Sequence, residues 1–254
     1  MNRVIAFSRR NFKEILRDPL SYIFCLGFPL VMLIIMTLVN ESIPAEAGMV
    51  IFRIDYLSGG IAVFGLTFIM LFTCLSVAKD RAGAFLVRLY TTPMRSGDFI
   101  MGYIAPVMVI ALAQVLITFA ASLVVSLITG VELSAAGQAL ALLALIPSAV
   151  MMIGFGLLFG SLFGEKAAPG LCSIVISLAS FLGGVWFDPD GTGGVLLKIC
   201  KALPFYHSVY AARCAAALNF EVFWGHFAVT AAWALVITVA AVLIFKAKMK
   251  AETR

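Results

Sequence analysis

The sequence predicts an all-α polytopic membrane protein with six transmembrane helices. Six long apolar stretches contain no Asp, Glu, Lys or Arg, and the charged residues collect in the connectors between them. A membrane-spanning helix needs about 20 apolar residues, rising about 1.5 Å each, to cross about 30 Å of hydrocarbon. The composition agrees, because 63% of the 254 residues are hydrophobic, 12% are charged and the mean hydropathy is +1.08. A water-soluble domain could not bury that much apolar surface.

The chain is expected to form a single transmembrane domain over residues 1–254. A charge at the centre of a bilayer costs about 2.5–3.5 kcal/mol, so the charge-free stretches are natural membrane helices. They are Leu20–Val39, Leu57–Ala78, Ile100–Thr129, Leu133–Phe163, Ala167–Phe187 and Val222–Phe245.

The distribution of basic residues predicts the orientation of these spans. With six spans both chain ends share one side, and most of the 18 Lys and Arg residues fall in segments on that side. By the positive-inside rule, both termini are therefore expected in the cytoplasm. The net charge of +5 reflects this topology and an attraction to anionic lipid headgroups, and it gives no argument for nucleic acid as a partner.

Segment 1–19, before the first span, is predicted to be an amphipathic helix lying in the cytoplasmic membrane interface. Its apolar residues recur near helical spacing between Arg and Lys, at Val4, Ile5, Phe12, Ile15 and Leu16. Pro19 ends this helix before the first span begins. The alternative is a solvated basic tail, which the helical spacing of the apolar residues disfavours.

The connector 79–99, between the second and third spans, is predicted to form a helix, a break and a second helix on the cytoplasmic surface. Its first part is amphipathic, with Phe85 and Leu89 beside Arg88, and the break falls at the Thr-Thr-Pro sequence 91–93. Such a segment offers a contact to a soluble partner. The alternative is a loop that touches only lipid headgroups.

The connector 188–221, before the last span, is predicted to form two short outer helices that re-enter the membrane or lie at its rim. The pieces Val195–Leu203 and Tyr206–Leu218 are fairly apolar, are separated by Pro204 and are too short to span. Aromatic residues that suit a membrane interface occur in and beside them, at Trp186, Phe205, Tyr206 and Tyr210.

Catalytic and metal-binding motifs are absent from the sequence. There is no nucleotide-binding P-loop, zinc-protease motif or nucleophile elbow. His207 and His226 have no His, Cys or Glu neighbour at ligand spacing, so each is expected to be a structural hydrogen-bonding residue. The spans hold no Asp or Glu of the kind used by ion-coupled transporters, and the Gln114 amide is expected to bond between helices. No catalytic, cofactor-binding or metal site is predicted.

Two further features leave alternatives open. Gly156, Gly160 and Gly164 form a stripe of small residues in the fourth span, which suits either a subunit interface or packing within the chain. Cys200 and Cys214 share the outer connector and could pair if that face of the membrane is oxidising.

Two regions of the sequence carry a resemblance to a known family, and the first is the inner connector. It begins with the charged residues Lys79-Asp80-Arg81 and continues with Gly83, Leu89 and the pair Thr92-Pro93. This order is similar to the pattern E-R-E-x-G-T-x-E-x-L-x-x-T-P. Lys79 and Ala84 depart from that pattern, because Glu is common at both places.

The second region lies at the outer end of the fifth span. Residues 183–189 read G-G-V-W-F-D-P and residues 203–206 read L-P-F-Y, which is similar to the pattern S-G-x-x-[FW]-P followed by N-P-[LF]. Together with six spans and an interfacial helix, these motifs make nearly the whole chain resemble the permeases of the ABC type-2 transporter family.

The resemblance implies the membrane half of an ATP-driven exporter. Two permease chains, identical or closely homologous, would form the pathway and pair through their first and fifth spans. Two separate ATP-binding subunits would bind ATP and Mg²⁺, so this chain would hold no cofactor and would not be an enzyme. The resemblance places the contacts to the ATP-binding subunit at Arg81, Phe85, Arg88, Leu89, Thr92 and Pro93. It places an outer gate at Trp186, Phe187, Pro204, Phe205 and Tyr206.

The implied location is the cytoplasmic membrane of a bacterium, and the implied substrate is hydrophobic or amphipathic, such as a drug, a peptide or a lipid-linked molecule. Two other classes of protein share a multi-span architecture. A membrane-embedded enzyme or assembly factor for lipid-like substrates would require a polar cluster on the pathway. A stand-alone secondary transporter would require a buried ionisable group.

Overall fold

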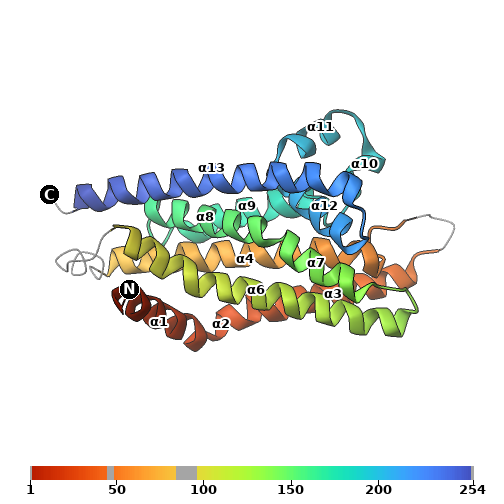
Figure 1. The fold of residues 1–254 in the computed structure, drawn as a ribbon, viewed down its shortest axis with the longest axis horizontal. Coiled ribbons are helices and arrows are strands. Elements are labelled where there is room, and N and C mark those ends of the chain that lie inside the picture. The colour runs from red at the N-terminus through yellow and green to blue at the C-terminus, as the bar shows by residue number, and fades with distance from the viewer. Residues whose placement is uncertain (1, 45–48, 84–95, 253–254) are drawn as a thin grey trace.

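The computed structural model describes residues 2–44, 49–83 and 96–252, and the secondary structure of these residues is helical throughout. Figure 1 shows long helices lying side by side in one bundle, with the first and the last helix reaching the same end. We call this end the inner end, and we call the opposite end, where the short helices α10 and α11 lie, the outer end. The predicted all-α polytopic architecture is confirmed.

The helices follow the predicted order of elements. They are α1 (Asn2–Arg17), α2 (Pro19–Tyr22), the π-helical segment η1 (Ile23–Gly27), α3 (Phe28–Ser42), α4 (Ile54–Ala82), α6 (Ser96–Thr129), α7 (Ala135–Ala144), α8 (Ile146–Leu162), α9 (Ala168–Leu182), α10 (Pro189–Thr192), α11 (Gly194–Ala202), α12 (Pro204–Ala216) and α13 (Phe220–Glu252). Within the described residues, five helical stretches are long and apolar enough to cross a membrane, namely Pro19–Ser42, Ile54–Ala82, Gly97–Thr129, Ala135–Leu162 and Phe220–Lys248.

The remaining predicted span, Ala167–Phe187, is occupied by α9, which is shorter than expected. It has 15 residues and is therefore about 22 Å long at 1.5 Å per residue. The chain leaves the helix after Leu182, and Gly184 adopts a positive φ of 75°, which glycine tolerates without a steric penalty. The continuous helix predicted as far as Phe187 is wrong at this end, and the total of six crossings stays a prediction.

Proline residues interrupt two of the other spans. The fourth predicted span, Leu133–Phe163, is divided into α7 and α8 at Leu145, and Pro147 lies in the first turn of α8. In the first span, the π-helical segment η1 precedes Pro29 at the start of α3. Proline donates no backbone hydrogen bond, so a break or a widened turn is expected on its N-terminal side.

Helix α4 forms the centre of the bundle. It contacts α3, α6, α8, α9 and α12, and Ile61, Leu66 and Met70 on it are fully buried. Glycine permits part of this close packing, because a Cβ added at Gly65 would overlap the Gln114 amide of α6. A movement of α4 therefore has to involve most of its neighbours.

The outward faces of α3, α6 and α13 are apolar. Leu127 on α6 is 85% exposed and Leu235 on α13 is 66% exposed. A buried apolar core surrounded by exposed apolar helices is the arrangement of a bundle that lies in lipid. The chain is thus a multi-pass membrane protein.

The glycine stripe of the fourth span packs within the chain. A Cβ at Gly156 would lie 2.6 Å from the Met70 carbonyl oxygen, and one at Gly160 would lie 2.7 Å from the Cys74 carbonyl oxygen. Both carbonyls belong to α4, so the stripe allows α8 and α4 to approach closely. Gly164 has open space around it.

The amphipathic helix predicted before the first span is present as α1, and the alternative of a solvated tail is wrong. It lies across the inner end of the bundle (Figure 1) and contacts α6. Phe7 and Ile15 are buried, whereas Ile5 and Leu16 are exposed. The helix therefore has one apolar side against the protein and leaves further apolar side chains free for an interface.

The outer connector contains the two predicted helices, and these two helices pack differently against the bundle. Helix α11 stands away from the bundle (Figure 1), and its Val195 is 74% exposed. Helix α12 contacts α4, α7, α9 and α13 and is largely buried. A third short helix, α10, lies at the start of the connector, before the two predicted helices. The depth of these helices in a membrane stays a prediction.

Candidate functional site

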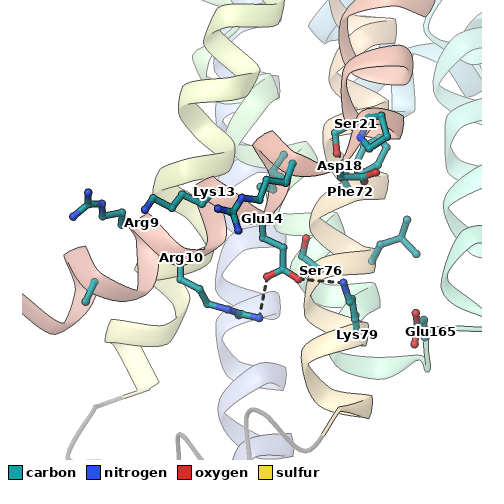
Figure 2. A pocket seen from close by; sticks show the side chains of 15 residues that line it. Arg9, Arg10, Lys13, Glu14, Asp18, Ser21, Phe72, Ser76, Lys79 and Glu165 are labelled. Carbon is teal, nitrogen blue, oxygen red and sulfur yellow. Dashed lines mark hydrogen bonds and ion pairs between the residues drawn. The ribbon is translucent and has the colours of Figure 1, made fainter.

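A groove with a volume of about 970 Å³ opens at the inner end, between α1, the start of α2 and the last turns of α4 (Figure 2). Basic side chains of α1 line it, among them Lys13 and Arg17. Lys79 of α4 lies across from Lys13. Phe72 and Leu75 of α4 add apolar atoms to its wall. The groove therefore combines positive charge with apolar surface.

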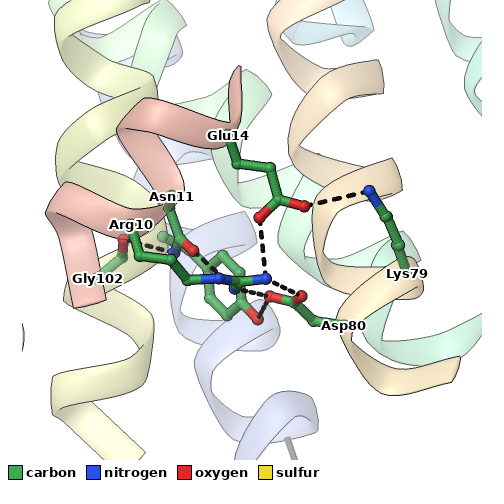
Figure 3. Close-up of polar contacts among 7 residues, drawn as sticks. Arg10, Asn11, Glu14, Lys79, Asp80 and Gly102 are labelled. Atoms are coloured by element: carbon green, nitrogen blue, oxygen red, sulfur yellow. Dashed lines mark hydrogen bonds and ion pairs between the residues drawn. The ribbon is translucent and has the colours of Figure 1, made fainter. Parts of the chain in front are cut away.

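Beside this groove, Arg10 of α1 and Asp80 of α4 form a bidentate ion pair (Figure 3). Arg10 Nη1 and Nη2 donate to the two carboxylate oxygens of Asp80 at 2.8 and 2.9 Å. The Tyr103 hydroxyl of α6 donates to Asp80 Oδ2 at 2.7 Å. Asp80 is only 6% exposed, so these charge-assisted bonds replace the water that its carboxylate loses on burial. Three helices meet at one carboxylate.

Glu14 and Asn11 extend these contacts along α1. Glu14 forms ion pairs with Arg10 and Lys79. Its Oε2 lies 2.9 Å from Arg10 Nη2, and its Oε1 lies 3.1 Å from Lys79 Nζ. Asn11 Nδ2 donates to the Gly102 carbonyl oxygen of α6 at 3.0 Å. We call the polar group at this junction the inner network; it consists of Arg10, Asn11, Glu14, Lys79, Asp80 and Tyr103.

A glycine on α6 lets α1 lie close enough to make these bonds. A Cβ added at Gly102 would overlap the ring of Phe7. That ring is buried and packs edge-on against Tyr103, with ring centroids 5.1 Å apart. The apolar contact and the inner network thus fix α1 to α6 and α4 on the same face of the helix.

Arg81, a predicted contact to an ATP-binding subunit, is engaged within the chain. Its Nη1 donates to the carbonyl oxygens of Gly160 at 2.9 Å and Ser161 at 2.6 Å. These carbonyls lie in the last turn of α8, where a cation also interacts favourably with the helix dipole. Arg81 therefore joins the end of α4 to the end of α8, and a contact to a partner stays a prediction.

The other predicted contacts to the ATP-binding subunit are Phe85, Arg88, Leu89, Thr92 and Pro93, which lie outside the described residues. The described helices that flank this segment are α4, which ends at Ala82, and α6, which begins at Ser96. Both helix ends lie at the inner end of the bundle (Figure 1). The last turns of α4 before this segment are therefore anchored by Asp80 of the inner network and by Arg81.

The predicted outer-gate residues gather around the start of α12. Pro204 and Phe205 are buried in the first turn of this helix, and Phe205 packs near Phe155 of α8, with ring centroids 6.2 Å apart. Trp186 packs edge-on against Phe64 of α4 at 5.1 Å. Phe205 thus packs near α8 and Trp186 packs against α4, and their role as a gate stays a prediction.

The other two predicted gate residues belong to a separate small cluster. Phe187 packs against a buried group that contains Tyr206 and Tyr210. The Tyr206 hydroxyl lies 2.9 and 3.1 Å from the two carboxylate oxygens of Asp190 and donates to this carboxylate. Burial alone raises the pKa of Asp190, but hydrogen bonds from both tyrosines and the Lys201 ammonium outweigh it and hold the pKa below its ordinary value.

A buried arginine that the sequence did not single out holds α12 in place. Arg213 is 5% exposed, and it donates to the Tyr56 carbonyl oxygen at 3.0 Å and to the Gly184 carbonyl oxygen at 2.8 Å. Its guanidinium lies 4.6 Å from the centroid of the Tyr56 ring and 5.3 Å from that of Tyr210. Arg213 thus joins α12 to the first turn of α4 and to the turn after α9.

The two histidines, which look isolated in the sequence, meet at the outer end. Their Nδ1 atoms are 2.9 Å apart, and His207 Nε2 lies 2.9 Å from the Lys201 carbonyl oxygen. In the Nδ1 contact one imidazole donates and the other accepts. The expected structural role fits these contacts.

Among the described residues, no group of three or more His, Cys, Asp or Glu side chains is gathered closely enough to hold a metal ion. Cys200 and Cys214, the possible outer pair, are free thiols in the structure.

Sequence reasoning missed the partners of the inner network. In the sequence, Asp80 stands among the charged residues that begin the inner connector, and Arg10 is one of several basic residues of the first helix. One signal for such a partner is present in the sequence, because Asp80 closely follows an apolar span. A carboxylate buried at that position needs a cation as its partner, or it must lie outside the membrane. The sequence could not say which of the many nearby basic residues would supply that charge.

Comparison with known proteins gives one family match. Residues 2–217 match a family model described as ABC-2 type transporter. No curated protein matches the chain. The matched range begins in α1 and ends just after α12, so it includes the inner network, the inner connector and the cluster of Phe187, Tyr206 and Tyr210.

Proposed function

The chain belongs to the ABC-2 type transporter family and is a membrane permease subunit of an ABC transporter; from this premise we propose that it is half of an exporter powered by a separate ATP-binding subunit. The family match over residues 2–217 carries the proposal. The absence of a nucleotide-binding motif from the sequence supports it. ATP and Mg²⁺ would then be bound by the partner subunit, and this chain would transport without catalysing hydrolysis.

The inner connector is the proposed contact with the ATP-binding subunit. Its two flanking helices are anchored where the described residues end, α4 through Asp80 and Arg81 and α6 through Tyr103. A displacement of the connector would therefore reach α1, α6 and α8 together. Phe85 and Arg88 are the proposed anchors, because aromatic and arginine side chains typically contribute about 2 kcal/mol or more each to such interfaces.

The proposed substrate is hydrophobic or amphipathic. A groove of about 770 Å³ between α3 and α6 supports this class, since its lining is mostly apolar and includes Leu33, Ile34, Val124 and Ile128. The choice among a drug, a peptide and a lipid-linked molecule requires ligands from the native membrane, identified by mass spectrometry of the purified complex.

A second permease chain is proposed to complete the pathway, paired through the first and fifth spans. Helix α9 supports this, because Ile174, Leu178 and Phe181 on it are exposed apolar residues. Native mass spectrometry in lipid should find two permease chains with the ATP-binding subunits. A single permease chain bound to its ATP-binding subunit would contradict the proposal.

The proposed setting is the cytoplasmic membrane of a bacterium, with both termini in the cytoplasm. The position of α1 and the end of α13 at the same end of the bundle supports a shared side for the termini (Figure 1). Labelling of single cysteines placed in α1 and near residue 248 with an impermeant reagent tests this in intact cells, where neither position should react.

The alternative is a stand-alone secondary transporter, and the buried carboxylate of Asp80 is the feature of the structure that would suit it. Such a transporter needs a carboxylate that gains and loses a proton during transport. Both carboxylate oxygens of Asp80 are engaged within the protein, because they accept two bonds from Arg10 and one from Tyr103. The geometry therefore suits a fixed structural ion pair better than a proton carrier.

The decisive experiment is export by the permease co-expressed with the ATP-binding subunit that co-purifies with it. The double variant Phe85→Ala/Arg88→Ala should abolish ATP-dependent export and weaken assembly of the complex, while insertion into the membrane is unchanged. Leu243→Ala/Lys246→Ala is the matched control, because both residues are exposed at the inner end of α13. Wild-type, ATP-dependent export by the Phe85/Arg88 variant would show that the connector is only a surface loop.

A further inference from the structure

The groove at the inner end carries more positive charge than the protein itself neutralises. Five basic and three acidic side chains line it. The carboxylate of Glu14 pairs with Arg10 and Lys79. The carboxylate of Asp18 accepts from the Leu20 amide and the Ser21 hydroxyl at the start of α2. Two of the three carboxylates are thus already committed to other groups.

The remaining basic residues, Arg9, Lys13 and Arg17, form a row along α1. They are spaced four residues apart, which places them above one another on one side of a helix. All three are exposed, and none of them has a hydrogen bond or ion pair to another described residue. Like charges at this spacing destabilise a helix, so an anion bound beside the row would relieve the repulsion.

Apolar surface adjoins the same row of charges. Phe72 and Leu75 line the groove on the α4 side. Directly beyond Pro19, the first span exposes Leu20, Ile23 and Phe24. A ligand with an anionic head and apolar chains would place its head beside Lys13 and Arg17 and its chains along this part of the span.

We propose that the groove binds the phosphate headgroup of an acidic membrane phospholipid. The shared chemistry is a phosphate anion, which could also come from a free phosphate ester. The lipid is favoured because the groove lies where the first span begins, so that headgroups are its natural neighbours. The bound lipid would hold α1 against α4 beside the inner network. The proposal is independent of the direction of transport and of the transported substrate.

The test measures lipid binding to the full-length protein, purified in a neutral detergent, by native mass spectrometry. The probes are dioleoylphosphatidylglycerol, dioleoylphosphatidylcholine and sn-glycerol 3-phosphate. The wild-type protein should bind the acidic lipid selectively. Lys13→Gln/Arg17→Gln should weaken that binding about 30-fold, because each basic residue near an anionic surface contributes about a factor of five.

Lys246→Gln/Lys248→Gln is the matched control for the loss of charge. It removes two exposed basic residues from the inner end of α13, outside the groove lining, and should leave the affinity for the acidic lipid unchanged within about twofold. An equal loss of affinity in both double variants would overturn the proposal, since binding would then depend on total charge alone. Equal binding of the two phospholipids would also overturn it.

Two further measurements separate a lipid site from an anion site and from misfolding. Glycerol phosphate that binds as tightly as phosphatidylglycerol would overturn the assignment to a lipid. Glu165→Gln removes an exposed carboxylate from the groove lining and should tighten binding of the acidic lipid, a gain that a misfolded variant would not show. Unchanged or weaker binding by this variant would contradict the proposed position of the headgroup.

Discussion

The ion pair between Arg10 and Asp80 should stabilise the fold much more than a similar pair at the surface. Arg10→Gln leaves the buried Asp80 carboxylate without its bidentate cation, and Asp80→Asn leaves the guanidinium with Glu14 alone among the carboxylates of the inner network. Removing one partner of a fully buried pair costs about 3–5 kcal/mol. The Arg10 side chain is 35% exposed and that of Asp80 is 7% exposed, so solvent reduces the expected loss to about 2 kcal/mol.

The pair between Arg53 and Asp55 at the outer end is a matched control. It is also bidentate, with distances of 2.7 and 2.6 Å, but its side chains are 48% and 30% exposed. Exposed pairs of this kind contribute about 0–1 kcal/mol. The two pairs share their bidentate geometry and differ in burial, in sequence separation (70 positions against 2) and in the further contacts of Arg10 and Asp80 with Glu14 and Tyr103.

The assay is a double-mutant cycle for each pair, using the free energy of unfolding from denaturant titration in mixed micelles. The coupling energy should be about 1.5–2 kcal/mol for Arg10 and Asp80 and about 0.5 kcal/mol for Arg53 and Asp55. Proteolysis in α1 should also become faster in the Arg10 and Asp80 single variants. A coupling energy at the inner pair no larger than that of the control would refute the argument that burial makes the inner pair strong.

Three further predictions concern other contacts. Gly156→Ala should lower the free energy of unfolding by about 1–3 kcal/mol, because the added methyl group would overpack against the Met70 carbonyl. Gly164→Ala, whose methyl group meets open space, should leave the free energy of unfolding unchanged. Equal effects of the two substitutions would contradict the close approach of α8 and α4. Arg213→Gln should lower the free energy of unfolding by about 2 kcal/mol, because the buried Tyr56 and Gly184 carbonyls lose their donor. The same substitution should speed proteolysis of the outer connector. An unchanged rate of proteolysis would count against the role of Arg213 in holding α12. The pKa of Asp190 is lowered in the folded protein, so its stabilising effect is present above the pKa of the unfolded chain and is lost as the pH falls through the folded value. Asp190→Asn should therefore reduce stability at pH 7, with the difference from the wild-type protein disappearing in strong acid, and a difference that is constant with pH would contradict this.

Hydrophobic patterning was sufficient to predict five long membrane helices and the amphipathic helix, because both depend on local composition and spacing. The end of α9 was missed because two glycines inside an apolar run look like part of a span, and only the φ of Gly184 shows the turn. The division of the fourth span at Leu145 follows from Pro147 in the first turn of α8. Local signals thus located the elements, while their ends depended on backbone conformation.

The candidate site was harder to predict because it depends on which distant residues meet. Arg10 and Asp80 are 70 positions apart, and Tyr56 and Arg213 are 157 apart. A single sequence contains many basic residues near Asp80, and charge alone does not choose among them. The predicted connector contacts could be named from a family pattern, whereas Arg213 belongs to no pattern and is recognised only from its burial.

Arginine contacts fasten both ends of the central helix. At the inner end, Arg10 holds Asp80 and Arg81 holds the last turn of α8; at the outer end, Arg213 holds the Tyr56 carbonyl in the first turn of α4. Helix α4 has 29 residues and is about 43 Å long at 1.5 Å per residue. A helix packed on all sides and fastened at both ends moves as a rigid element. Under the proposed function, a displacement that the ATP-binding subunit imposes after Ala82 would therefore reach α12 and the proposed outer gate through α4 itself.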